Sequence, residues 1–201
     1  MQAIIQQQLK KALQSLNKQY ADLLTDPMTE ITVYDAPFLS RYQIYGVEHF
    51  DPYASVFFYV GFAERQRAYI LTGTPENYVK MFKADGAVIA AVEPAARYAA
   101  TYLDVTRSMK KLFYLVRSVD EVKFRPNLSG DEAQARAAFI DQYRPVITPP
   151  SATLTSQGYQ VTLYAVREQA LERHTLTVKK KGEIQDQLTV LAQSLPLVYG
   201  V

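Results

Sequence analysis

The stretch that decides the fold lies near the C-terminus and reads ATLTSQGYQVTLYAV (152–166) and LERHTLTVKKKGEIQDQLTVL (171–191). Apolar and polar residues alternate in both parts, as expected for strands with one face toward a core. Gln157-Gly158 and Lys181-Gly182 are typical turn pairs, so each part is expected to form a β-hairpin. Asp186 breaks the alternation, because it falls on the apolar side of its strand. The segment predicts an antiparallel meander with one solvent-exposed face.

The N-terminal residues 4–24 predict an amphipathic helix. Apolar residues recur there at spacings of three and four, and the helix is expected to end at Asp26-Pro27, because a residue before proline avoids the helical conformation. The helix is expected to lie on the protein's own sheet or, since its spacing also fits two heptads of a coiled coil, to bind a partner. In the second case the interaction surface consists of Leu9, Leu13, Leu16, Tyr20 and Leu23.

Residues 30–73 are expected to form strands. The segment EITVYDAPFLSRYQIYGV (30–47) is rich in β-branched and aromatic residues, and ASVFFYVGF (54–62) is followed after a polar turn by RAYILTG (67–73) as a hairpin. Large apolar side chains occupy both faces of residues 56–62. We therefore expect this strand to be central in its sheet and covered on both sides.

Helices and one further strand are expected between the two strand regions. Thr74 is a suitable N-cap for a helix that begins at Pro75 and ends at Gly86. A second helix is expected at PAARYAATYL (94–103), and a strand over the second half of KKLFYLVRSVDEVKF (110–124). The segment SGDEAQARAAFIDQYRP (129–145) predicts a helix, with Ser129 and Glu132 as a capping box and Pro145 as its end.

These elements together predict an α+β protein, in which helices pack on one face of twisted antiparallel sheets. The expected division is a helix and hairpin region, residues 1–91, and an α+β meander region, residues 92–201, as one compact unit or two closely packed halves. From residue 75 onward, the order of elements is similar to the cone-shaped nuclear-transport-factor-like fold. That resemblance implies either a small-molecule enzyme or a periplasmic scaffold domain of a type IV secretion or conjugation machine.

Composition excludes several kinds of chemistry. The 201 residues contain no cysteine, which excludes disulfides, thiolate nucleophiles and cysteine-ligated metals. The net charge is +2, so we expect no nucleic-acid partner, and the lysine run 179–181 is interpreted as a solvated turn. No segment has the signal peptide or membrane span pattern. We therefore expect a cytoplasmic protein, with a periplasmic domain separated from its anchor as the alternative.

Candidate ligand-binding residues cluster in the tyrosine-rich strand region. The segment VEHFDPY (47–53) places a histidine beside carboxylates, and such groups can bind a ligand or transfer protons. No metal site, cofactor motif or catalytic constellation accompanies it. The expected ligand-binding residues are Tyr45, Glu48, His49, Asp51 and Tyr53.

Two functions follow from these features. The first is a non-enzymatic interaction or assembly protein, self-associating or binding a protein partner, for example as a component of a bacterial secretion or conjugation apparatus. The alternative is a small-molecule-binding or catalytic protein with a pocket of Tyr and Phe side chains on a concave sheet. The sequence contains 15 Tyr and 9 Phe, which is compatible with both.

Overall fold

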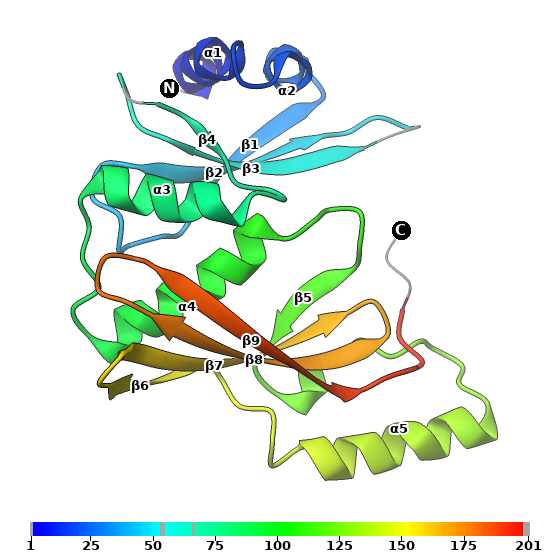
Figure 1. The fold of residues 1–201 in the computed structure, drawn as a ribbon. Coiled ribbons are helices and arrows are strands. Elements are labelled where there is room, and N and C mark those ends of the chain that lie inside the picture. Colours follow the sequence, from blue (N-terminus) through cyan, green and yellow to red (C-terminus); the bar gives the residue numbers. More distant parts are fainter. Residues whose placement is uncertain (1, 53–54, 66, 199–201) are drawn as a thin grey trace. The chain divides into compact units, whose positions relative to one another are not determined.

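The computed structural model describes residues 2–52, 55–65 and 67–198, and it has the predicted α+β architecture with antiparallel sheets (Figure 1). The chain forms two compact units. The first comprises Met1–Val88 and Val105–Met109, and the second comprises Ile89–Asp104 and Lys110–Val201. The boundary that the sequence predicts lies between residues 91 and 92.

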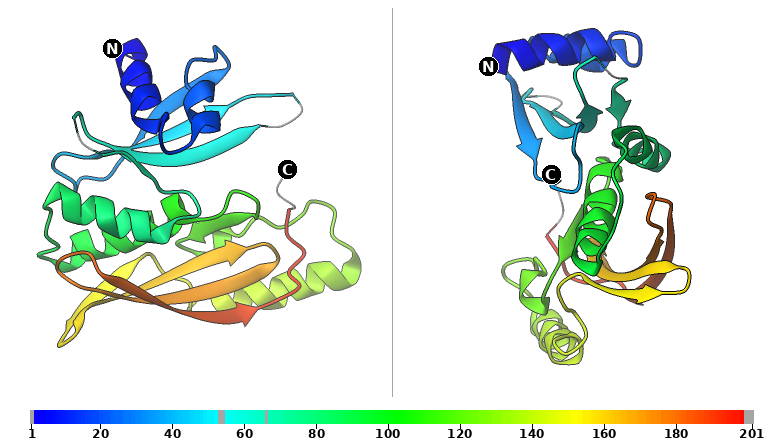
Figure 2. Two further views of the ribbon diagram at one scale, coloured as in Figure 1. Left: turned by 45° about the horizontal axis from the view of Figure 1, so that its top comes forward. Right: turned by 90° about the vertical axis from the view of Figure 1, so that its left-hand side faces the viewer.

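The first unit is a sheet with helices on both faces (Figure 2). Its strands lie in the order β1 (Thr29–Tyr34), β2 (Gln43–His49), β3 (Val56–Phe62) and β4 (Tyr69–Ile70). Helices α1 (Gln2–Leu13) and α2 (Lys18–Leu23) bury Leu9 and Leu13 against Phe58 and Val60 of β3. Helix α3 (Pro75–Asp85) packs on the opposite face. β3 is therefore central and covered on both sides, as predicted.

A glycine in β3 allows α3 to approach closely. Gly61 faces α3, and a Cβ atom at this position would lie 2.0 Å from the Met81 sulfur. α3 ends at Gly86 with a φ of 79°, as predicted. Thr74 is the N-cap residue of α3, as predicted, but its hydroxyl donates to the Thr72 carbonyl instead of accepting a bond from the helix.

The predicted helix over residues 4–24 is interrupted. α1 ends at Leu13, and α2 begins after Asn17, whose side-chain oxygen accepts a hydrogen bond from the Tyr20 N–H at 3.1 Å. Asparagine is among the preferred N-cap residues, because its short side chain satisfies the free N–H groups of a first turn. A new helix therefore begins where the apolar spacing alone predicts continuation.

The second unit is built on the predicted meander. Strands β7 (Gly158–Arg167), β8 (Ala170–Val178) and β9 (Ile184–Ala192) pair in sequence, while β5 (Phe113–Val116) and β6 (Ser151–Thr155) pair with β7. Helix α5 (Gly130–Tyr143), with the predicted capping box, packs Phe139 against Val166 and Leu171. Part of α4 (Val92–Thr106) also belongs to this unit, and the Tyr98 hydroxyl donates to the Gly182 carbonyl at 2.7 Å. The likeness to the nuclear-transport-factor-like fold stays a prediction.

The strand in residues 110–124 is in the first half of the segment, so its predicted position is wrong. β5 covers Phe113–Val116, and a 3₁₀ turn, η1 (Val119–Glu121), occupies the second half. Val119 and Val122 are both buried in the core of the second unit, whereas Asp120 between them is exposed. A spacing of three matches one turn of a 3₁₀ helix, so the turn buries both valines on one side.

Candidate functional site

The structure separates the predicted ligand-binding residues. Tyr45, Glu48 and His49 lie on β2 and Asp51 follows that strand, while Tyr53 lies outside the described residues. Because successive side chains of a strand point to opposite faces, Tyr45 and His49 share one face and Glu48 lies on the other. Among the described residues of the predicted set, Glu48 therefore does not point to the same side as Tyr45 and His49.

His49 has a structural role in the first unit. Its Nδ1 lies 3.0 Å from the hydroxyl oxygen of Thr29, and that hydroxyl also lies 2.7 Å from the Leu23 carbonyl oxygen. Asp26 is at 3.9 Å from the same ring nitrogen. These contacts connect the end of β2 to the end of α2. In the described part of the chain, no cluster of three or more His, Asp or Glu is arranged to hold a metal ion.

The predicted interaction surface is largely used within the first unit. Leu9 and Leu13 are fully buried, Tyr20 stacks on Phe58 with 4.0 Å between ring centroids, and Leu23 is half-buried. Only Leu16 of the five is exposed. The helix therefore packs on its own sheet, and its use as a partner-binding surface stays a prediction.

An unpredicted feature of the second unit is a buried chain of polar side chains. The His174 ring is 2% exposed, and its Nδ1 lies 2.7 Å from Asp186 Oδ2 while its Nε2 lies 3.3 Å from Glu172 Oε2. The Arg167 Nε donates to both Glu172 oxygens, at 3.1 and 3.0 Å. We call Arg167, Glu172, His174 and Asp186 the polar chain. It runs from the end of β7 across β8 to β9.

Each ring nitrogen of His174 faces a carboxylate. A carboxylate oxygen accepts hydrogen bonds, so Asp186 and Glu172 are acceptors for the two ring nitrogens. The Arg167 guanidinium pairs with Glu172, so this buried carboxylate has a cationic partner. Both ring nitrogens are engaged by carboxylates, which leaves neither for a substrate. The polar chain therefore holds its own side chains in fixed positions.

Strand pairing brings these residues together. Glu172 and His174 are two residues apart on β8 and share a face, and the register places Leu188 opposite His174 and Asp186 opposite Leu176. Phe113 of β5 covers the same region. Its ring meets the His174 ring edge-on at 6.4 Å, and the Arg167 guanidinium carbon lies 5.0 Å from its centroid.

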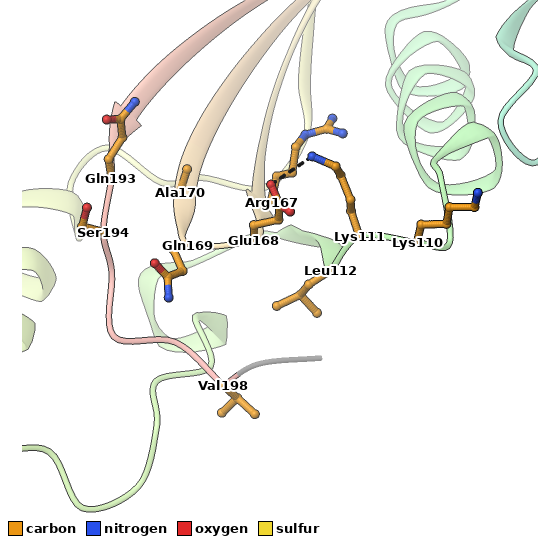
Figure 3. A pocket seen from close by; sticks show the side chains of 10 residues that line it. All are labelled: Lys110, Lys111, Leu112, Arg167, Glu168, Gln169, Ala170, Gln193, Ser194 and Val198. Carbon is orange, nitrogen blue, oxygen red and sulfur yellow. Dashed lines mark hydrogen bonds and ion pairs between the residues drawn. The ribbon is translucent and has the colours of Figure 1, made fainter. Parts of the chain in front are cut away.

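Arg167 also lines a pocket of about 630 Å³ (Figure 3). The walls come from the segment before β5, the β7–β8 turn and the segment after β9. The lining residues are Lys110, Lys111, Leu112, Arg167, Glu168, Gln169, Ala170, Gln193, Ser194 and Val198. Figure 3 shows Lys111 reaching Glu168, at 3.2 Å, while Lys110 points away from it.

Backbone hydrogen bonds hold the pocket walls in place. The Glu168 N–H donates to the Leu112 carbonyl at 2.9 Å, and the Leu195 N–H donates to the Gln169 carbonyl at 3.0 Å. The three wall segments are therefore joined by the protein's own backbone hydrogen bonds. Walls held in this way are preformed, as those of small-molecule sites usually are.

A second pocket, of about 430 Å³, lies in the first unit. It is lined in part by Tyr34, Tyr42, Tyr45 and Phe62, and burial raises the pKa of the Tyr45 hydroxyl. Tyr45 of the predicted ligand-binding residues lines this pocket, whereas Glu48, His49 and Asp51 do not. The lining of this pocket matches the predicted aromatic pocket better than the lining of the pocket in the second unit does. No described residue that lines the pocket of the second unit is aromatic.

The sequence contains a partial signal of the polar chain. Asp186 is the one residue that breaks the apolar alternation of its strand, and Glu172 and His174 also lie two apart in an alternating segment. Polar residues on the buried side of a strand need partners. The sequence does not show which residues those partners are, because that depends on the pairing of β8 with β9.

Comparison with known proteins adds no functional information. No family model, curated protein or solved structure matches the chain. Across the described residues, no helix has both the length and the apolar character that crossing a bilayer requires.

Proposed function

We propose that this is a non-enzymatic binding protein, whose second unit holds a ligand that carries a carboxylate group and an apolar chain. The observation behind this proposal is the position of Arg167. It lines a preformed pocket, while Glu172, itself held by His174, fixes the guanidinium from the side of the sheet. A cation held in this way is preorganised, which lowers the entropy cost of binding an anion.

The remaining lining suits such a ligand. Lys111 supplies a second cation, Gln169, Gln193 and Ser194 supply polar side chains, and Leu112 and Val198 supply apolar surface. Pockets for small molecules commonly combine apolar walls with a few polar groups that orient the ligand. The volume also falls within the range of about 300–1,000 Å³ that is usual for such pockets.

Lys111 can exchange its present partner for the ligand at low cost. Its ion pair with Glu168 is at 3.2 Å, and both side chains are more than half exposed. An exposed pair of this kind contributes at most about 1 kcal/mol, because water screens both charges. A ligand carboxylate that displaces Glu168 therefore loses little.

A carboxylate group on an apolar chain occurs in two kinds of ligand. The C-terminal carboxylate of a partner protein would make this chain an interaction or assembly component, for example of a secretion or conjugation apparatus. A free carboxylic acid would make it a small-molecule-binding protein. A second candidate site for an apolar or aromatic molecule is the pocket of the first unit, which is supported by its four aromatic side chains.

The test is calorimetric titration of the full chain with octanoate, with octanol as the uncharged comparison. We expect octanoate to bind and Arg167→Gln to weaken binding at least about tenfold, since a hydrogen bond to a charged group contributes about 1.5–3 kcal/mol. Arg144→Gln is the matched control, because Arg144 pairs with exposed Asp120 and is absent from the pocket lining. Glu168→Gln should strengthen binding by releasing Lys111.

Two further comparisons separate the sources of the ligand and the sites. A peptide ending in apolar residues and a free carboxylate, compared with its amidated form, tests the protein-partner source. Nuclear magnetic resonance shifts at residues 110–112 and 167–170 would support the pocket of the second unit, and shifts at residues 33–45 would support the first. Equal binding of octanoate and octanol, or equal binding by Arg167→Gln, would reject the carboxylate proposal.

A further inference from the structure

Strand β9 forms an open edge of the second sheet. In the described part of the chain it pairs with β8 alone, and Figure 1 shows it as the last strand of the meander. Residues 185–190 are exposed on both faces of the strand. Leu188 is 51% exposed and Val190 is 43% exposed, so the edge presents apolar side chains as well as backbone groups.

Over residues 184–190, this edge has little of the usual protection against pairing. Soluble proteins place lysine, proline, bulges or charges on exposed edge strands, because a free row of N–H and C=O groups attracts another strand. Residues 184–192 contain no Lys, Pro or Gly, and Asp186 is their one charged residue. Its carboxylate is hydrogen-bonded to the His174 ring of β8. The register irregularity lies near Val190 and Ala192, so residues 184–190 form the regular part.

We infer that β9 pairs antiparallel with β9 of a second copy of this chain, across a twofold axis at Leu188. In a twofold interface, if residue i of one copy faces residue j of the other, then residue j of the first copy faces residue i of the second. An antiparallel pair of identical strands satisfies this condition. The pairing places Leu188 opposite Leu188, Gln187 opposite Thr189 and Asp186 opposite Val190. No two like charges face each other, which is the condition for favourable cross-strand pairs.

The lysine turn selects the antiparallel direction. Lys179, Lys180 and Lys181 lie just before β9 and are exposed. In a parallel pair the two lysine turns would meet at the same end, with six like charges together. In the antiparallel pair they lie at opposite ends of the paired edge. This self-association does not depend on the proposed ligand of the pocket.

The experiment is sedimentation of the full chain over a range of concentrations, with Leu188→Lys as the variant. We expect a dimer, and a dissociation constant at least about tenfold higher for Leu188→Lys, because two lysines would then face each other. The matched control is Leu154→Lys on the five-residue strand β6, where Leu154 is 66% exposed. It should leave the dimer unchanged.

Cross-linking tests the register directly. The chain has no cysteine, so Leu188→Cys introduces a single thiol. Directly opposed Cβ atoms of an antiparallel pair are about 4.5–5.5 Å apart, close to disulfide distance. Oxidation should cross-link Leu188→Cys but not Leu154→Cys. A monomer at every concentration, a dimer that Leu188→Lys does not weaken, or no cross-link at position 188 would each overturn the inference.

Discussion

Gly158, the first residue of β7, has a φ of 130°, a backbone conformation that residues with a side chain rarely adopt. A Cβ atom at this position would lie 2.5 Å from the Val178 carbonyl oxygen. That oxygen is part of the backbone and cannot rotate away. We expect Gly158→Ala to lower the free energy of unfolding by about 3 kcal/mol, as measured by urea denaturation.

The matched control for this prediction is Gly130→Ala. Gly130 is the first residue of α5, and a Cβ atom there would meet nothing within 4 Å. Alanine restricts the unfolded chain more than glycine does, so the change should be neutral or stabilising by up to about 1 kcal/mol. Equal losses for the two variants would contradict the assignment of the Gly158 effect to local backbone geometry.

Asp85, the last residue of α3, is buried and accepts several hydrogen bonds. Its carboxylate accepts backbone N–H groups of Ser40 at 2.9 Å, Arg41 at 2.7 Å and Tyr42 at 2.7 Å, and the Ser40 hydroxyl at 2.8 Å. Burial works to raise the pKa of Asp85, but these hydrogen bonds outweigh it and leave the pKa lowered. The ionised carboxylate therefore fastens the loop before β2 to α3.

The lowered pKa predicts a pH-dependent effect of Asp85→Asn. An unfolded aspartate has a pKa of about 3.9, so the stabilisation by the carboxylate is complete above that pH and is lost as the pH falls through the lower folded value. We expect Asp85→Asn to cost about 2–3 kcal/mol at neutral pH and less at about pH 3, in urea denaturation. A cost that stays constant or grows on acidification would contradict the lowered pKa.

The polar chain is the feature to test at the scale of secondary-structure elements, because it links β7, β8 and β9. His174→Ala leaves the buried Glu172 with Arg167 as its remaining partner in the polar chain and removes the link to Asp186. Removing one member of a buried charged network typically costs about 3–5 kcal/mol. We expect a loss of about 3 kcal/mol and faster hydrogen exchange of the β9 amides, measured by mass spectrometry.

The other histidine of the chain serves as the control. His49→Ala removes a single hydrogen bond to Thr29, whose hydroxyl keeps its contact with the Leu23 carbonyl. We expect a smaller loss, of about 1–2 kcal/mol, with no change in the exchange of β9 amides. Equal effects of the two substitutions on β9 would show that the polar chain does not hold that strand.

At the scale of the whole molecule, each unit has a separate hydrophobic cluster. Leu13 belongs to the cluster of the first unit and Leu171 to that of the second, and both are fully buried. Leu→Ala at such sites costs about 2–5 kcal/mol. We expect Leu13→Ala to increase hydrogen exchange mainly in residues 5–80 and Leu171→Ala mainly in residues 113–195.

Leu16→Ala is the control for that experiment. Leu16 is exposed, and surface substitutions usually change stability by no more than about 0.5 kcal/mol. Leu16→Ala should therefore leave exchange in both units unchanged, while still removing one residue of the predicted interaction surface. A uniform increase of exchange along the chain in Leu13→Ala would indicate one cooperative unit instead of two.

Local patterns determined most of the secondary structure. Alternation and turn residues predict the hairpins of β6 to β9, and the capping box at Ser129 and the glycine at position 86 mark helix ends, because these signals depend on residues within a few positions. The predictions failed in two places. Asn17 caps a new helix within an apolar pattern that continues, and packing buries Val119 and Val122 together through a 3₁₀ turn.

Only the tertiary structure determined which residues form the candidate site. Histidine with acidic neighbours is visible at residues 48–51, yet β2 turns Glu48 and His49 to opposite faces. The spacing of Glu172 and His174 places them on one face of β8, but only the pairing of β8 with β9 brings Asp186 to His174, twelve residues away along the chain. A slip of one residue in that register would turn β9 over and remove the contact. Sequence alone determined that these strands form, whereas the register between them determined which polar side chains meet.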